Sequence, residues 1–152
     1  MVRAILGVIG GYIAMAVIVI AAFSIAFLVI GPDSAYRPGV FEVTPLWIGI
    51  MFGVGLVAAI VGGLVCALIA TRGSKAPIAL CVLVAILGSF SAVGAMTKED
   101  PGPRAGDIEV FEAASKAKQP VWVAWSHPVV GIIGVLIGAR LRGSGTGEPS
   151  AP

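Results

Sequence analysis

The chain has 152 residues, of which 58% are hydrophobic and only 12% are charged, and its net charge at pH 7 is +2. Soluble domains carry about twice this charged fraction, and disordered chains combine low hydrophobicity with high charge. The composition therefore excludes both classes. So small and scattered a net charge also argues against a nucleic-acid partner. A chain of this length is expected to form one membrane-embedded domain.

Four long runs without Asp, Glu, Lys or Arg follow one another along the chain. They are residues 4–30, 45–70, 77–96 and 120–139. A helix needs about 20 apolar residues to cross the hydrocarbon core, and the runs lack the alternation of membrane β-strands. The sequence therefore predicts an all-α membrane protein, a bundle of four transmembrane helices over residues 1–142. The first run exceeds the apolar part of a signal peptide, about 7–15 residues, so we expect it to be retained.

Proline and aromatic residues mark the ends of these runs. Each of the last three runs begins at a proline, where the missing N–H costs nothing because the first turn leaves it unpaired anyway. Aromatic side chains gather near the same positions, namely Tyr36, Phe41, Trp47, Trp122 and Trp125. We expect them to form a belt at the water–lipid interface.

Four spans place both ends of the chain on one side of the membrane. With the N-terminus inside, each side carries five Lys or Arg residues, and the net charge is +4 inside and −2 outside. The inner basic residues stand on short segments close to helix ends, where they oppose translocation most strongly. We therefore expect cytoplasmic termini, with a disordered cytoplasmic tail at 143–152 that is rich in Gly, Ser and Pro.

The longest connection is residues 97–119. Its second half is typical of a short helix, capped by Asp107 and stabilised by the i,i+4 pair of Glu112 and Lys116. Ile108 and Phe111 are positioned to rest on the membrane surface. We interpret this segment as a solvated connector helix, and a docking surface for a partner is the alternative.

Small residues at four-residue spacing indicate how the helices pack. Inside lipid, close backbone contact replaces the exclusion of water as the driving force for association, and residues four apart share a helix face. The longest stripe lies in the second run, which we place at the centre of the bundle. A substrate path along these stripes is the less favoured interpretation. The predicted packing residues are Gly7, Gly11, Gly55, Ala59, Gly63, Gly134 and Gly138.

His127 is the only histidine, and it directly precedes Pro128. Proline removes one backbone hydrogen bond and frees the carbonyl of Ala124, so we expect a kink, with His127 bonding that carbonyl or interfacial water. An axial-ligand or proton-handling role is the alternative. Metal and haem sites need further ligands, which the spans do not offer. The spans also lack acidic and basic side chains, so we predict no catalytic, metal-binding or cofactor-binding residue and no cofactor.

Cys66 and Cys81 are the only cysteines, and they do not form a C-x-x-C pair. Both lie near the predicted cytoplasmic side, where stable disulfides are rare. They are equally distant from the turn at 71–76, so an antiparallel hairpin would place them at the same depth. The small residues beside Cys66 favour contact with the third run. We expect reduced thiols within reach of a crosslinker, and redox catalysis is a weak alternative.

The two longer loops share the pattern R-x-G-x-apolar-E-V, at 37–43 and at 104–110. A Pro-x-Trp signal follows each of them, at 45–47 and at 120–122. Duplication of a helical hairpin, giving two parallel repeats, is one hypothesis for this pattern. A chance match is the other.

Three segments give the chain a resemblance to a known class of proteins. They are the start Met1-Val2-Arg3, the entry Gly10-Gly11-Tyr12, and the ending P-V-V-G-I-I-G-V-L-I-G-A-R-L at 128–141. The arrangement resembles small bacterial inner-membrane proteins with four helices and no assigned function. The resemblance implies a bacterial inner-membrane location and supplies no catalytic residue.

Three functional hypotheses follow. The first is a non-enzymatic structural or interaction subunit whose partners are the lipid bilayer and a second copy or another membrane protein. The second is a small transporter or channel subunit that works as an oligomer, although few polar side chains are available to line a pore. The third, an enzyme using His127 or the cysteines, requires a bound cofactor with a visible spectrum.

The threading generates the first testable prediction. Topology reporters fused after Ile30 and after Met96 should be active outside the cytoplasm, and those fused after Ala70 and after Arg142 inside it. The physical reason is the basic residues close to the helix ends on the predicted inner side. An external C-terminus would overturn the predicted orientation.

Overall fold

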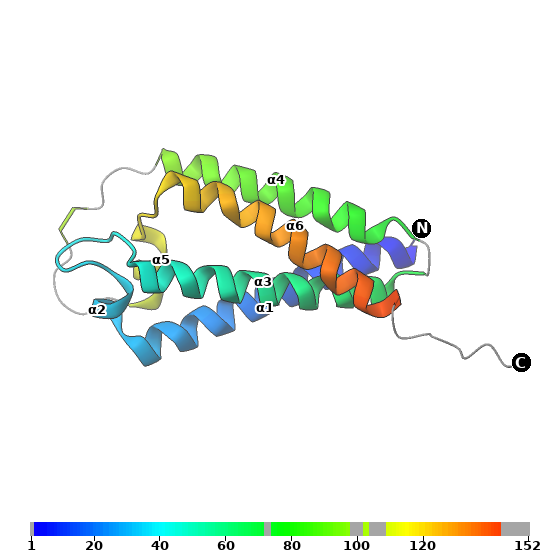
Figure 1. Ribbon diagram of the computed structural model, residues 1–152, viewed down its shortest axis with the longest axis horizontal. Helices are drawn as coiled ribbons and strands as arrows, with labels where there is room; N and C mark the ends of the chain where they lie inside the picture. The colour runs from blue at the N-terminus through cyan, green and yellow to red at the C-terminus, as the bar shows by residue number, and fades with distance from the viewer. Residues whose placement is uncertain (1, 72–73, 98–101, 104–108, 144–152) are drawn as a thin grey trace, which may run out of the picture.

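The computed structural model describes residues 2–71, 74–97, 102–103 and 109–143 (Figure 1). It contains four long helices and two short ones. The long helices are α1 (Val2–Ile30), α3 (Pro45–Ile69), α4 (Ala76–Met96) and α6 (Val121–Gly143), and the short ones are α2 (Pro32–Ala35) and α5 (Val110–Lys116). All four long helices have the length and apolar composition of membrane spans. The predicted all-α bundle of a multi-pass membrane protein is confirmed.

The helix boundaries follow local sequence signals. Thr44 caps α3, because its hydroxyl accepts a hydrogen bond from the amide of Trp47 at 3.2 Å. The last helix continues beyond the predicted end at residue 139 to Gly143, with Arg140 and Arg142 in its final turn. Basic side chains are favourable there because they interact with the negative end of the helix dipole. The rest of the predicted disordered tail, 144–152, lies outside the described residues.

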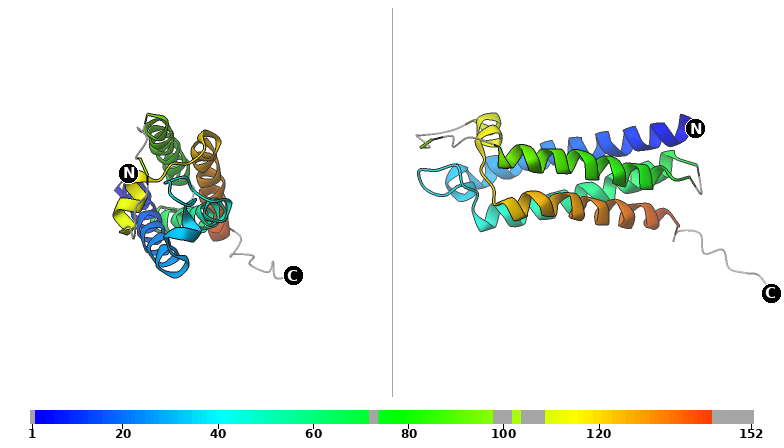
Figure 2. Two further views of the ribbon diagram at one scale, coloured as in Figure 1. Left: turned by 90° about the vertical axis from the view of Figure 1, so that its left-hand side faces the viewer. Right: turned by 90° about the horizontal axis from the view of Figure 1, so that it is seen from above.

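The four long helices surround one another in the order α1, α3, α6, α4 (Figure 2). The first and last helices have their chain ends at one end of the bundle, called here the terminal end (Figure 1). The short helices α2 and α5 cover the opposite end, called here the cap end. As expected, α3 makes the most extensive contacts of the four, chiefly along α1 and α6. It barely contacts α4, the next helix in the chain.

The contact between α3 and α6 is a parallel pair built on small residues in the terminal half of the bundle. A Cβ atom added at Gly63 would overlap the backbone of Val135. One added at Gly138 would overlap the carbonyl of Ile60, and one at Gly134 would lie 2.5 Å from the Cβ of Ala59. Only glycine permits so close an approach, so dispersion contacts and backbone packing hold these helices together in lipid.

The contact between α1 and α3 has the same character but is antiparallel. A Cβ atom at Gly7 would lie 2.8 Å from the carbonyl oxygen of Cys66, and one at Gly11 would lie 2.7 Å from that of Gly62. The small face beside Cys66 therefore packs against α1. Cys66 itself also belongs to one buried cluster with Leu80 and Cys81 of α4, so the expected contact with the third span stays a prediction.

Gly55 differs from the other predicted packing residues. A Cβ atom added there would meet no atom within 4 Å. The stripe of small residues on α3 thus makes tight contacts only in the terminal half. At the level of Gly55 the two hairpins, α1–α3 and α4–α6, diverge, and a crevice lies between them.

At the cap end, the loop after α1 folds onto the bundle around aromatic side chains. Tyr36, Phe41 and Trp47 are buried together with Phe27. The rings of Phe27 and Trp47 meet edge to face with centroids 6.1 Å apart, and those of Tyr36 and Phe41 are also 6.1 Å apart. These residues form a core instead of the predicted interfacial belt. Of the five aromatic residues, only Trp122 and Trp125 are exposed as a belt requires.

The second loop joins this core through α5. The hydroxyl of Tyr36 donates to the carbonyl of Ala113 at 2.9 Å, in a fully buried contact. The backbone of Val43 donates to the carbonyl of Lys118 at 3.1 Å, and Lys118 donates to that of Phe41 at 2.9 Å. We call the assembly of residues 31–44 and 109–118 the cap. The segment predicted as a solvated connector is therefore one part of a small folded unit.

The predicted ion pair of α5 is confirmed, whereas its predicted cap is not. Lys116 and Glu112 form the expected i,i+4 ion pair, with Nζ and Oε1 2.8 Å apart. Glu109 occupies the N-cap position in place of the predicted Asp107, because the helix begins at Val110. The proposed cap Asp107 and its neighbour Ile108 lie outside the part of the chain that the structure describes.

The two copies of the loop pattern differ in local structure. Val43 lies in an extended bridge with Tyr36, whereas Val110 is the first residue of α5. Trp47 is buried beneath the cap, whereas Trp122 is exposed. Residues 104–108 of the second copy are not among the described residues. The duplication therefore stays a hypothesis, and the two valines and the two tryptophans do not support it.

The small-residue contact generates the second prediction. Gly63→Leu should lower the free energy of unfolding by about 1–3 kcal/mol or more, because the new side chain must displace the backbone of α6. Gly53→Leu is the matched control on the same helix, since a Cβ there meets no atom within 4 Å. The measurement is helix loss followed by circular dichroism during unfolding in detergent. Equal stability of the two variants would contradict the close α3–α6 contact.

Candidate functional site

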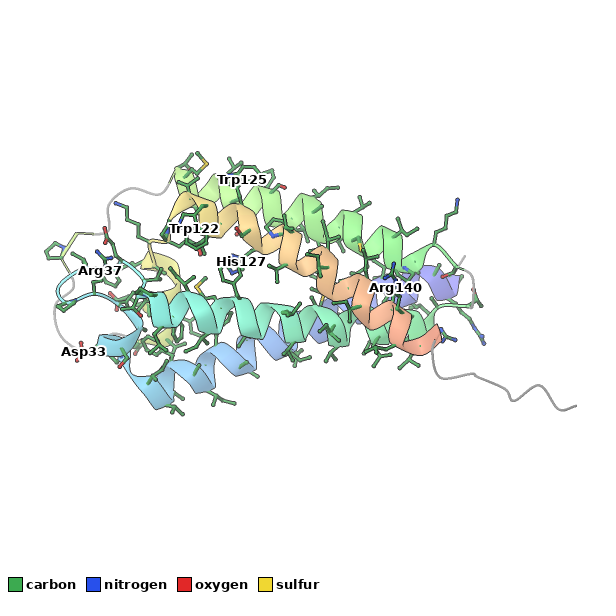
Figure 3. The ribbon with its side chains drawn as sticks, viewed as in Figure 1. Asp33, Arg37, Trp122, Trp125, His127 and Arg140 are labelled. Carbon is green, nitrogen blue, oxygen red and sulfur yellow. The ribbon has the colours of Figure 1, made fainter. Side chains whose placement is uncertain are left out.

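All four long helices line a crevice that separates the two helical hairpins towards the cap end. Its volume is about 280 Å³. Its walls include Gly55 and Phe52 of α3, His127 of α6, and Tyr12 of α1. Figure 3 shows His127 between α6 and α3, further from the cap end than Trp122. The one histidine of the chain thus lies where the hairpins diverge.

The imidazole of His127 is fixed by two contacts. Its Nδ1 atom lies 2.7 Å from the carbonyl oxygen of Val123. Because a carbonyl only accepts hydrogen bonds, Nδ1 carries the proton, and in the neutral ring Nε2 is then an acceptor. The ring also stacks on Phe52, with centroids 5.0 Å apart and planes 19° from parallel. Phe52 stacks in turn on Trp122 at 6.3 Å.

The expected partner of His127 was either interfacial water or the carbonyl of Ala124, which lacks its amide donor because residue 128 is proline. The structure corrects this, because the ring reaches the carbonyl four residues before itself, that of Val123. The helix continues through Pro128. The proline ring packs against α4, where a Cβ atom at Gly88 would lie 2.7 Å from its Cγ atom. Pro128 therefore fills the space that Gly88 leaves.

Most of the crevice wall is apolar and adaptable. Met15 and Met51 contribute flexible thioethers, which fill irregular spaces, and Tyr12 and His127 bring the polar side-chain atoms. Tyr12 and Leu87 are 39% and 41% exposed, so the crevice is open at its rim. Both residues stand well inside membrane spans, so this opening faces lipid. The site suits a neutral, largely apolar molecule that enters from the bilayer.

The two cysteines lie outside the crevice, in the core of the terminal half. Both thiols are free and buried, and both belong to one cluster with Leu80 and Val135. The Sγ atom of Cys81 points to the carbonyl oxygen of Ile132 at 4.0 Å, a weak contact. The shared cluster is compatible with the predicted equal depth. Their crosslinking distance stays a prediction.

The described residues contain no group of three or more His, Cys, Asp or Glu side chains that could hold a metal ion. Sequence reasoning singled out His127 but missed Phe52, Met51 and Tyr12 as its neighbours in one site. No signal in the sequence marks them, because they come from two other helices and differ little from ordinary lipid-facing residues. Gly55 was identified from its spacing and assigned to packing, whereas its lack of a side chain leaves space in the crevice.

No model of a known protein family matches the chain, and no curated protein or solved structure is significantly similar to it. The class of protein therefore rests on the fold itself, which is that of a multi-pass helical membrane protein.

The geometry of His127 generates the third prediction. His127→Gln should fold and lose only about 1–2 kcal/mol of stability, because it forfeits one hydrogen bond and one ring stack. Thermal unfolding in detergent measures this loss. Ser126→Ala is the matched control, since its hydroxyl makes the same type of bond, to the carbonyl of Trp122 at 2.7 Å. Loss of an absorbance band or of a bound metal in His127→Gln would instead establish a cofactor role.

Proposed function

We propose that this chain is a non-catalytic interaction subunit of the bacterial inner membrane, with both termini in the cytoplasm. The observation that carries the proposal is the cap. A connection between two membrane spans needs no core of its own, yet here two loops fold together through buried aromatic rings and backbone hydrogen bonds. Fixing these loops costs conformational entropy. A preformed surface lowers the entropy that is lost when a partner binds, so a binding role would explain the folded cap.

The exposed side of the cap has the composition of a contact surface. Phe111 on α5 is 85% exposed, while Ala113, two residues later, is buried against Tyr36. Two ion pairs stand on the same unit: the Lys116–Glu112 pair lies on α5, and Arg37 and Glu42 pair at 3.5 Å on the loop after α1. An exposed aromatic residue is typical of protein contacts. The partner is a second copy of the chain or another membrane protein.

Basic residues at the terminal end support the proposed orientation. Lys75 precedes α4, and Arg140 and Arg142 occupy the last turn of α6. The guanidinium of Arg142 donates to the carbonyl of Ala70 at the end of α3, at 2.7 Å. Positive charge close to the ends of several helices favours retention of that end in the cytoplasm.

One observation favours the transporter or channel subunit as the second candidate, namely the crevice lined by all four helices. Tyr12 and His127 are the polar side chains of its wall that could contact an ion. A conducting path would therefore need polar groups from further copies. Ion or solute flux in vesicles that contain only this protein would favour the second candidate over the first.

Photocrosslinking tests the interaction proposal. Phe111 and Phe90 suit a matched comparison, because both are phenylalanines with 85% and 81% of their surface exposed, one on the cap and one on the membrane face of α4. A benzophenone amino acid at position 111 should give one discrete protein adduct in native membranes, identifiable by mass, whereas position 90 should give lipid adducts. No protein adduct at 111, or the same adduct at both positions, would contradict a role for the cap.

A further inference from the structure

We propose that the crevice between the hairpins is a binding site for a neutral, single-ring aromatic alcohol that is dissolved in the bilayer. This inference is independent of the cap, because it rests on the residues around His127.

The volume sets the size of the ligand. A protein cavity of about 150 Å³ accommodates benzene, and this crevice offers about 280 Å³. One substituted ring fits, whereas a phospholipid with two acyl chains does not. Gly55 contributes to this space, because a Cβ atom there would meet nothing within 4 Å.

The wall favours a flat molecule. The stacked rings of His127 and Phe52 lie 19° from parallel and form an aromatic surface inside the crevice. Planar rings gain from offset or edge contacts with such a surface, and the thioethers of Met15 and Met51 adapt to the remaining shape.

The imidazole selects the polar group. Nδ1 is bound to the carbonyl of Val123 at 2.7 Å, so the neutral ring presents Nε2, its distal atom, as an acceptor. No hydrogen bond to Nε2 occurs within the described part of the chain. A hydroxyl satisfies this atom, whereas an ether or a hydrocarbon leaves it unpaired in an apolar site. No Asp, Glu, Lys or Arg belongs to the crevice wall, so the ligand carries no net charge.

The route of entry determines where the ligand comes from. Tyr12 and Leu87 stand at the open rim, and both are partly exposed in the middle of membrane spans. The two helices that carry them, α1 and α4, make few contacts with each other. A molecule that partitions into the bilayer therefore reaches the crevice sideways between α1 and α4, without crossing the cap.

The single histidine makes a direct test feasible. The protein is labelled with ¹⁵N-histidine, purified in detergent without a histidine tag and titrated with thymol at about pH 8, where an ordinary histidine is neutral. Thymol is a phenol with one substituted ring, and its methyl ether is the matched probe without a donor. We expect thymol to move the resonance of the unprotonated ring nitrogen upfield. The ether should bind at least about tenfold more weakly, because it leaves the acceptor unpaired.

Two variants on one helix localise the effect. Gly55→Leu should abolish the response by filling the crevice, and Gly53→Leu should retain it, because residue 53 faces outward and is not part of the crevice wall. Partition of thymol into detergent is the same for both, and circular dichroism checks that both are folded. Equal shifts with thymol and its ether, no shift up to the solubility limit, or an unchanged response in Gly55→Leu would each overturn the proposal.

Discussion

The close contact between α3 and α6 is the constraint on which the rest of the structure depends. Inside a bilayer there is no water to expel from between helices, so only tight packing of atoms holds them together. Gly63, Gly134 and Gly138 allow the two backbones to touch in the terminal half of the bundle. This contact joins two helical hairpins that otherwise meet sparingly, since α4 has few contacts with α1 or α3.

The crevice is a consequence of where that contact stops. Towards the cap end, the next small residue of the stripe after Ala59 is Gly55, whose Cβ position is empty. The stacked rings of Phe52 and His127 line the gap at this level. Aromatic side chains of α3 and α6 meet at this level, whereas glycines allow the backbones to touch further along. The divergence of the hairpins and the one histidine thus lie at the same level of the bundle.

The cap closes the same end of the bundle and is held by a different type of interaction. Its buried rings exclude water, so the hydrophobic effect operates there as in a soluble domain. The hydroxyl of Tyr36 meets the carbonyl of Ala113, 77 residues further along the chain, and satisfies a group that burial would otherwise leave unpaired. Local sequence around Tyr36 or Trp47 cannot distinguish this core from an interfacial belt, because both use aromatic residues beside helix starts.

The sequence by itself determined the class, the number of spans and most of their ends, because length, hydropathy and helix-terminal residues act locally. It also identified Gly63 and Gly138 as small residues of the kind that permit close contacts. Only the tertiary structure decided which helices are neighbours, and it placed α1 against the small residues beside Cys66. It likewise decided that Gly55 borders a crevice and that Trp47 is buried. The physical reason is that the size and shape of a small or aromatic side chain limit the kinds of contact it can make. Which residue becomes its partner depends on the rotation and crossing of whole helices.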